Sequence, residues 1–284
     1  MAHVDVIKAK SVWEYAKAVE DLLKATQTRT GETSDQNWYR GHGRSESFVL
    51  KPTLYRHPDR ATLESLLDLE TELMRAFMSH HLLHTLTAGV DQSGKMDTLF
   101  YMQHYGVPTR LLDWTNNPLI ALYFAVSDAR IDRSTGEYPE GVAIWVLDPT
   151  SWNRKSLEDL RPPRGALNSS DGNLESYIPR APWKAADRKG MYLEPVAISG
   201  GANTQRMLAQ RGVFTMFGAD TRAMDELYDV NAYPSGCLTK VVIEPDDIKP
   251  VLDTLHAMGY TDSVAYPDLH GLALELKRLN GFNL

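Results

Sequence analysis

The most informative stretch of the sequence is HYGVPTRLLDWTNNPLIALYF, residues 104–124. A predicted helix begins near Met96 and ends within the first residues of this stretch, because Gly106 favours a helix end and Pro108 cannot continue a helix. Residues 111–114 (LLDW) are then predicted to form a short strand. The polar residues of this stretch therefore lie between segments whose apolar patterns indicate burial.

A second helix is predicted directly after this strand. Asn116 or Asn117 can cap it, Pro118 lies close to its first turn, and its body runs through LIALYFAVSDA, residues 119–129. The first turn of a helix has backbone N–H groups without intrahelical partners, and these favour an anion. The sequence therefore predicts an anion-binding turn between strand and helix.

Helices are predicted upstream as well. Residues 11–23 carry apolar side chains at helical spacing and begin with a capping box. The longest helical pattern covers residues 62–81. Between these two helices, Trp38 and Tyr39 predict a short strand that stops at a glycine turn after Arg40.

Strands dominate after residue 140. Buried strands bounded by turn residues are predicted at 141–149, 191–198, 212–218 and 237–245. Closing helices are predicted at 247–258 and 266–278, and residues 150–190, which show little periodicity, are predicted to be an insertion or long loop. This mixture of elements favours an α+β fold.

The composition is that of an ordinary globular protein, with 43% hydrophobic and 24% charged residues. The formal charge of −7 excludes a uniformly basic surface of the kind that binds nucleic acids. The single cysteine, Cys237, excludes an intramolecular disulfide and a cysteine-rich zinc site, and we expect no metal. No apolar run reaches about 18 residues and the N-terminal residues lack a long apolar segment, so we expect a cytoplasmic protein without membrane contact.

Arg40 is the first candidate binding residue. It follows a strand and precedes two nearby glycines, so that a ligand can approach the backbone while the guanidinium binds a phosphate through two hydrogen bonds. The alternative is an ion pair with a carboxylate at the strand end.

Two further segments combine polar residues with apolar flanks. In residues 103–118, Arg110 and Asp113 can pair with each other, and His104 is either an acid or base in catalysis or a structural residue at a helix end. In residues 206–215, Gln210 precedes a glycine and an apolar strand, where its amide can point into a cleft or be solvated in a loop.

The order of these segments resembles the FRG family, whose pattern matches Tyr39-Arg40-Gly41, residues 104–124, Gln210-x-Gly212-x-Phe214-Thr215 and residues 266–272 (YPDLHGL). The resemblance covers a core at about 36–276, and we expect a single FRG-type domain over 1–284 with the helix at 11–23 as its N-terminal helical part. The chain departs from the family pattern at His270, where an Asp is expected.

FRG domains are in turn similar to ADP-ribosyltransferases. This resemblance implies an α+β fold with a mixed, antiparallel split β-sheet core and NAD as the substrate and cofactor. It also implies that Arg40 holds the NAD diphosphate, that Thr115 is the hydroxyl of the second motif and that Gln210 is the residue of the third motif. With His104 these are the candidate catalytic residues. The implied NAD-binding residues are Tyr39, Arg40, Gly41, Arg110, Asp113, Asn117 and Tyr123.

Gln210 stands where the superfamily also has a Glu that stabilises the positive charge of the transition state. A neutral amide supplies a hydrogen bond without that charge, and charge stabilisation is usually the largest catalytic contribution. A carboxylate from Asp113, Glu194 or Asp268 is the alternative source of the charge.

The implied function is an enzyme that cleaves the nicotinamide bond of NAD and transfers ADP-ribose to a protein or nucleic acid, or to water as an NAD glycohydrolase. We associate the family with bacterial toxins and anti-phage defence effectors, so an antitoxin and a second copy of the chain are the partners considered. Two other functions remain open. One is a nucleotide-sensing module without turnover, and the other is an RNA-targeting toxin or nuclease that uses His104, Arg110 and Asp113.

Overall fold

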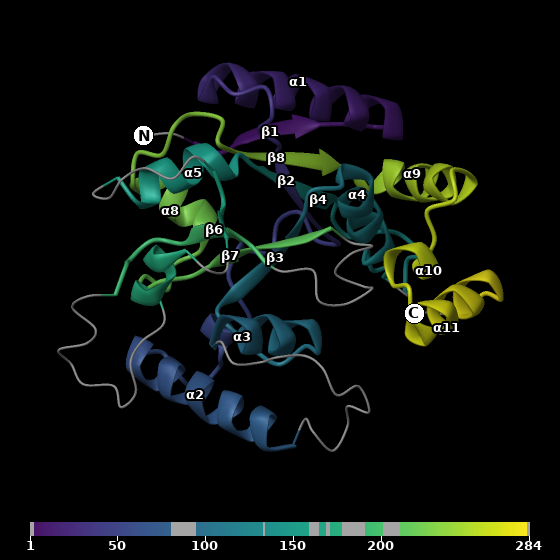
Figure 1. The fold of residues 1–284 in the computed structure, drawn as a ribbon. Coiled ribbons are helices and arrows are strands. Elements are labelled where there is room, and N and C mark those ends of the chain that lie inside the picture. The colour runs from purple at the N-terminus through teal and green to yellow at the C-terminus, as the bar shows by residue number, and fades with distance from the viewer. Residues whose placement is uncertain are drawn as a thin grey trace.

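The computed structural model describes residues 3–80, 95–132, 134–158, 165–168, 171–177, 191–200 and 211–282. Figure 1 shows the helices and strands in these ranges. In chain order they are β1 (Asp5–Lys8), α1 (Val12–Thr30), β2 (Trp38–His42), the 3₁₀ helix η1 (Leu54–Arg56), α2 (Leu63–His80), α3 (Lys95–His104), β3 (Leu111–Thr115), α4 (Pro118–Ser127), β4 (Val142–Leu147), α5 (Pro149–Ser156), β5 (Leu167–Asn168), the 3₁₀ helix η3 (Gly172–Ser176), β6 (Val196–Ser199), β7 (Gly212–Met216), α8 (Met224–Val230), β8 (Leu238–Ile243), α9 (Pro245–Ala257), α10 (Asp262–Ala265) and α11 (Leu269–Leu279).

The strands of the described residues form one eight-stranded sheet in the order β1-β8-β4-β2-β3-β7-β6-β5. β1 pairs with β8 and β5 pairs with β6 in parallel, and the other neighbours are antiparallel. A mixed sheet with helices between and after its strands confirms the predicted α+β fold.

The two central strands of the sheet, β2 and β3, are paired over a short length. β2 pairs with β4 along its whole length, and β3 pairs with β7 along its whole length. Between β2 and β3, however, the pairing is limited to Tyr39 and Thr115. The strands separate beyond this pair, so Arg40, Gly41 and His42 have a neighbouring strand on the β4 side alone within the described chain.

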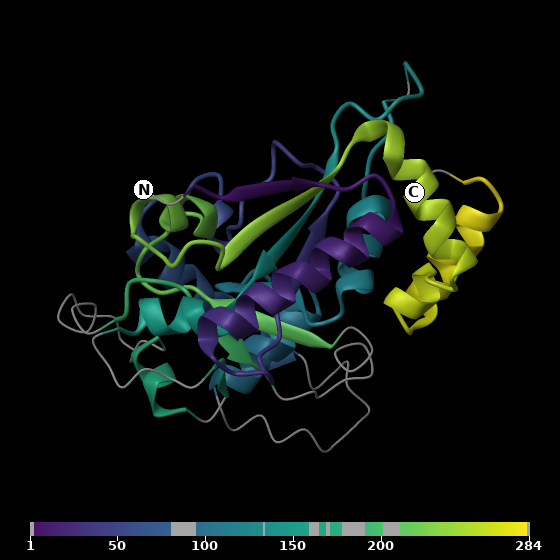
Figure 2. The same ribbon diagram turned by 90° about the horizontal axis from the view of Figure 1, so that it is seen from above.

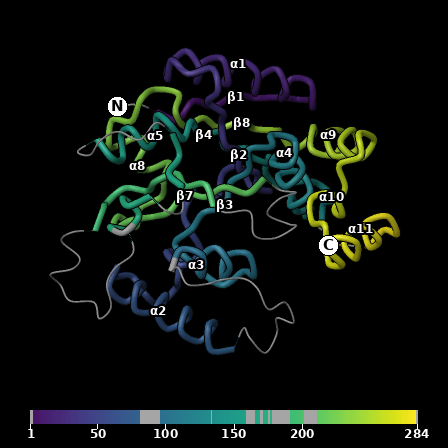
Figure 3. Tube along the Cα trace, in the orientation of Figure 1, coloured from purple at the N-terminus to yellow at the C-terminus, as the bar shows by residue number. Residues whose placement is uncertain are grey.

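Both faces of the sheet are covered. In β4, Val142, Ile144 and Val146 pack in one core cluster with α1, α4 and α9, while Trp145 and Leu147 belong to a second cluster with α8. This alternation is what a strand buried on both faces requires. Figure 2 shows α1 running alongside β1 and β8, and Figure 3 shows α9, α10 and α11 gathered beside α4.

The predicted glycine turn after Arg40 is wrong, because β2 continues through Gly41 to His42. Gly41 instead allows β2 to lie against α4, since a Cβ atom there would come within 1.8 Å of the carbonyl oxygen of Ala121. Gly43 has the same role, because its Cβ would lie 2.3 Å from the carbonyl oxygen of Asp128.

Several other elements differ from the sequence prediction. The segment 150–190, predicted to be an insertion or long loop, begins inside α5 and also contains β5 and η3 in its described part. The closing helix predicted at 266–278 corresponds to α11, which begins three residues later, after Pro267, and the short helix α10 before it was not predicted. β1 and α8 were not predicted at all, because both are short and carry a weak periodic pattern. None of the described helices combines the length and the apolar character that crossing a membrane requires.

Candidate functional site

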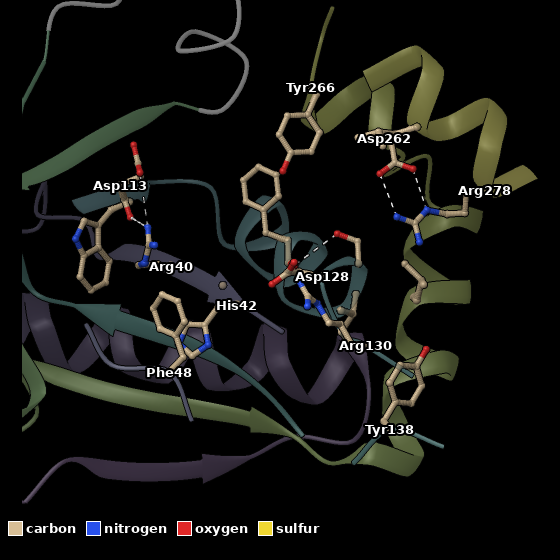
Figure 4. A pocket seen from close by; sticks show the side chains of 18 of the residues that line it. Arg40, His42, Phe48, Asp113, Asp128, Arg130, Tyr138, Asp262, Tyr266 and Arg278 are labelled. Carbon is tan, nitrogen blue, oxygen red and sulfur yellow. Dashed lines mark hydrogen bonds and ion pairs between the residues drawn. The ribbon is translucent and has the colours of Figure 1, made fainter. Parts of the chain in front are cut away.

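A pocket of about 1280 Å³ lies where β2 separates from β3. Its lining comes from the two central strands, from the end of α3 and from the wall formed by α4, α10 and α11. Figure 4 shows the side chains that face it, with Arg40 and Asp113 at one end and Asp262 and Arg278 at the other.

Arg40 lies at the sheet end of the pocket, and its side chain is 18% exposed. Its Nη1 donates a hydrogen bond to the main-chain carbonyl oxygen of Asp113 at 2.5 Å and lies 4.0 Å from the Asp113 carboxylate. Its Nε is buried and has no hydrogen-bond partner among the residues that the structure describes. Burial lowers the pKa of Arg40, the Asp113 carboxylate opposes this shift, and Arg56 adds to it. A desolvated cation with an unused donor is suited to binding an anion.

The guanidinium of Arg40 packs over the aromatic ring of Phe48. The Phe48 ring lies 5.7 Å from the Arg40 guanidinium carbon and stacks on the His42 ring with centroids 4.2 Å apart. His42 in turn accepts a hydrogen bond at Nε2 from the indole N–H of Trp145 at 2.8 Å. Burial, together with the charge of Arg40, lowers the pKa of His42 to about 3. His42 is therefore a neutral neighbour of Arg40 at physiological pH.

Asp113, on β3, is held in place by a residue at the end of α3. Its side chain is 56% exposed, and its Oδ2 accepts a hydrogen bond from the Gln103 amide at 2.6 Å. The Gln103 carbonyl accepts from the hydroxyl of Thr109, which fixes the orientation of the amide. Gln103 and His104, at the end of α3, both line the pocket.

The far wall of the pocket is built by helices. Arg278 on α11 donates to the buried Asp262 on α10 at 2.9 Å, which ties the two helices together. Tyr266 packs against Phe124 of α4 with ring centroids 5.4 Å apart. Asp128, after α4, accepts a hydrogen bond from the backbone N–H of Gly43 at 3.3 Å. This wall is therefore polar near α10 and α11 and aromatic near α4.

Four of the residues predicted from the sequence line this pocket: Arg40, Gly41, His104 and Asp113. They come from β2, from the end of α3 and from β3, so elements that are distant in sequence bring them together. Trp114, beside Asp113, also lines the pocket but is buried, and its indole N–H donates to the hydroxyl of Thr215 at 3.1 Å.

The predicted anion site at the start of α4 is not formed. The side-chain oxygen Oδ1 of Asn117 caps this helix and accepts hydrogen bonds from the N–H groups of Leu119 and Ile120 at 3.1 and 3.3 Å. Thr115, the predicted second-motif hydroxyl, is buried and accepts from the Asn117 N–H at 3.0 Å. Neither Thr115 nor Asn117 lines the pocket. Their side chains stabilise the strand-to-helix turn.

The two predicted tyrosines are likewise core residues. Tyr39 and Tyr123 are both buried in the cluster that β4 forms with α1, α4 and α9, and neither lines the pocket. Burial raises the pKa of Tyr39 to about 12. Direct contact between these rings and a ligand in the pocket is therefore not supported.

Arg110 pairs with Glu70, and the predicted pairing with Asp113 is wrong. The Arg110 side chain is 1% exposed, and its Nε donates to the Glu70 carboxylate at 2.8 Å. Nη1 donates to the carbonyl oxygen of Tyr177 at 2.8 Å. Asp113 lies within β3 and lines the pocket, which Arg110 does not. Arg110 is thus a core cation and does not reach the pocket.

The third predicted motif lies partly outside the described residues. Gln210 lies outside the described residues, while Gly212, two positions later, begins β7 and lines the pocket. Of the alternative carboxylates, Glu194 accepts hydrogen bonds from Tyr233 and Asn231 away from the pocket. Asp268 caps α11 by accepting from the N–H of Gly271 at 2.8 Å. Asp113 is the one of the three alternatives that lines the pocket.

Sequence reasoning missed most of the pocket wall: His42, Phe48, Asp128, Asp262 and Arg278. His42 directly follows the Tyr-Arg-Gly triplet. If the strand predicted at Trp38 and Tyr39 had been extended through the triplet, it would have included His42. Asp262 and Arg278 form a pair across α10 and α11, a contact that no local pattern reveals.

Within the described residues, no group of three or more His, Cys, Asp or Glu side chains is arranged to hold a metal ion. No curated protein and no solved structure matches the chain. The family model of the FRG domain matches residues 35–134, which include β2, α3, β3 and α4 and therefore the Arg40 end of the pocket. We identify residues 35–134 of this chain as an FRG domain.

Proposed function

We propose that the pocket binds NAD through Arg40 and that the protein cleaves the nicotinamide bond and transfers ADP-ribose to a macromolecule. The observation that carries the proposal is the buried Nε of Arg40, which has no hydrogen-bond partner in the described ranges and lies where β2 separates from β3. A diphosphate supplies the acceptors that this donor lacks, and a guanidinium binds such an anion through parallel hydrogen bonds.

The volume of the pocket is large enough for a dinucleotide. Its volume of about 1280 Å³ exceeds the roughly 300–1,000 Å³ of common ligand pockets. The anion-binding group is at one end, and the aromatic rings of Tyr266 and Phe124 are in the far wall. A dinucleotide has both an anionic centre and planar rings, and the remaining space leaves room for an acceptor group.

The resemblance of FRG domains to ADP-ribosyltransferases implies the reaction. In that reaction the bond between the ribose C1′ and the pyridinium nitrogen breaks, and its electron pair goes to the nitrogen. The ribose is left with a positive charge until a nucleophile bonds to C1′ and releases a proton. Water gives free ADP-ribose, and a macromolecular nucleophile gives a modified acceptor.

The nuclease alternative loses its basis, because it requires His104, Arg110 and Asp113 to act together. Arg110 is buried beside Glu70 and does not line the pocket. In the nucleotide-sensing alternative Arg40 also binds the phosphates of the ligand, but the ligand is not cleaved.

Incubation of the purified protein with NAD, followed by quantification of free nicotinamide, tests the proposal. We expect release above the rate of a protein-free sample, and a further increase when total protein or RNA is added as an acceptor. Arg40→Lys should release less, because a lysine lacks the planar fork. Binding of ADP-ribose without any nicotinamide release, with acceptors present, would contradict the enzymatic function and leave the sensing module.

A further inference from the structure

Where β2 and β3 separate, the carboxylate of Asp113 on β3 lies next to Arg40 on β2, the arginine proposed to bind the anion. We propose that Asp113 is the catalytic carboxylate of this pocket, which stabilises the positive charge on the ribose as nicotinamide leaves, and that Gln103 positions it. This inference rests on the proposed function and assigns to Asp113 the charge that Gln210 lacks.

The position of Asp113 is fixed by neighbours on both sides. Its main-chain carbonyl accepts from Arg40 Nη1 at 2.5 Å, and its Oδ2 accepts from the Gln103 amide at 2.6 Å. The hydroxyl of Thr109 holds the Gln103 carbonyl, which leaves the amide N–H groups directed at Asp113. The second carboxylate oxygen, Oδ1, makes no hydrogen bond in the described part of the chain and remains able to face a ligand.

A carboxylate at this place is unfavourable for a site that binds anions alone. It lies 4.0 Å from Arg40 Nη1, so it partly neutralises the guanidinium and repels a phosphate bound there. The same charge is favourable when a cation develops beside the diphosphate. The pair of Arg40 and Asp113 therefore matches a transition state with a diphosphate and a positive ribose better than it matches the bound anion.

The other carboxylates among the described lining residues have structural partners. Asp128 accepts from the backbone N–H of Gly43, and Asp262 is paired with Arg278. Asp262 lies at the far end of the pocket from Arg40, and Asp128 lies between the two ends (Figure 4). Asp113 is the carboxylate of this lining that lies beside the anion-binding group.

In the proposed step, the C1′–N bond of NAD breaks and its electron pair neutralises the pyridinium nitrogen. The ribose then carries the positive charge, which faces Asp113. A nucleophile, either water or an acceptor group, bonds to C1′ and gives its proton to the carboxylate or to solvent. No oxidant or reductant is required.

Asp113→Asn tests the role of the charge, because it keeps the shape of the side chain. We expect it to lower nicotinamide release by about 100-fold, the size of effect found when one transition-state contact is removed. Its affinity for ADP-ribose should rise about fivefold, because a nearby negative charge is lost. Asp21→Asn is the matched control, since Asp21 is similarly exposed, at 58%, but lies on α1 outside the pocket.

Gln103→Glu tests the positioning role. It replaces the 2.6 Å hydrogen bond with two facing carboxyl groups, whose repulsion raises their apparent pKa values. We expect the acidic limb of the kcat/KM profile to move to higher pH by about one unit. A purely structural Gln103 would change the amount of folded protein without moving this limb.

The outcomes separate the inference from the function on which it rests. Opposite changes in turnover and affinity in Asp113→Asn support the catalytic carboxylate. If the wild type releases nicotinamide and Asp113→Asn does so at a similar rate, the inference is overturned and the proposed function stands. If the wild type binds ADP-ribose or NAD without releasing nicotinamide, both are overturned.

Discussion

Arg40 Nη1 donates a hydrogen bond to the carbonyl oxygen of Asp113 at 2.5 Å, across the gap that opens between β2 and β3. Strand pairing joins these two strands at Tyr39 and Thr115, one position before Arg40 on β2. The arginine thus bridges the two halves of the sheet where the backbone ladder has ended. Because this bridge uses Nη1, the buried Nε is left for a ligand.

Replacement of Glu70 by Gln should destabilise the fold strongly. Arg110 would keep its charge in a buried site without a carboxylate partner, which costs about 3–5 kcal/mol of unfolding free energy. Urea unfolding measures this loss. Glu72→Gln on the same helix is the control, because its contact with Arg60 is longer, at 3.8 Å, and exposed, so about 1 kcal/mol or less is expected. Equal losses in the two variants would show that Arg110 is solvated.

This ion pair also marks the limit of the sequence prediction. The elements around residues 104–124 were predicted closely, because glycine, proline and asparagine punctuate them in a way that local chemistry explains. Arg110 and Glu70 are 40 residues apart, and no local pattern in the sequence links them. Which polar residue is buried depends on the partner that the tertiary fold supplies.

The residues of the pocket were also predicted only in part. Arg40 and Asp113 carry a recognisable local context, whereas the Asp262–Arg278 pair depends on how α10 and α11 fold back onto α4. The glycines after Arg40 suggested a turn, because the sequence does not show that a helix lies against them. Contacts between distant elements therefore account for most of what was missed.

Trp114→Ala should lower the free energy of unfolding by about 3–5 kcal/mol, the usual cost of removing a large aromatic side chain from a core. Trp114 is 3% exposed and also bonds the hydroxyl of Thr215. Trp13, at 69% exposure, gives the matched control, and Trp13→Ala should change stability by about 0.5 kcal/mol or less. A Trp114→Ala variant with unchanged stability and no ligand binding would assign the ring to the ligand instead.

His42 should make stability depend on pH below about 6.5. Its pKa is lowered to about 3 in the folded protein from 6.5 in the unfolded chain, so between these values the unfolded state binds a proton that the folded state does not. The stabilisation is full above pH 6.5 and is lost as pH falls, by at most about 1.4 kcal/mol per pH unit. Urea unfolding of the wild type and His42→Gln at pH 7 and pH 5 measures it. We expect a shallower dependence in the variant, and identical slopes would contradict the buried neutral histidine.

The central claim is that Arg40 binds the diphosphate of NAD, and the affinity of Arg40→Lys for ADP-ribose tests it most directly. Calorimetry should find wild-type binding, and the variant should bind about 10- to 100-fold more weakly, as expected when a charge-assisted hydrogen bond is lost. Arg222→Lys, which changes an arginine outside the pocket that pairs with Asp220, should bind like the wild type. Equal affinities of Arg40→Lys and the wild type would contradict the account.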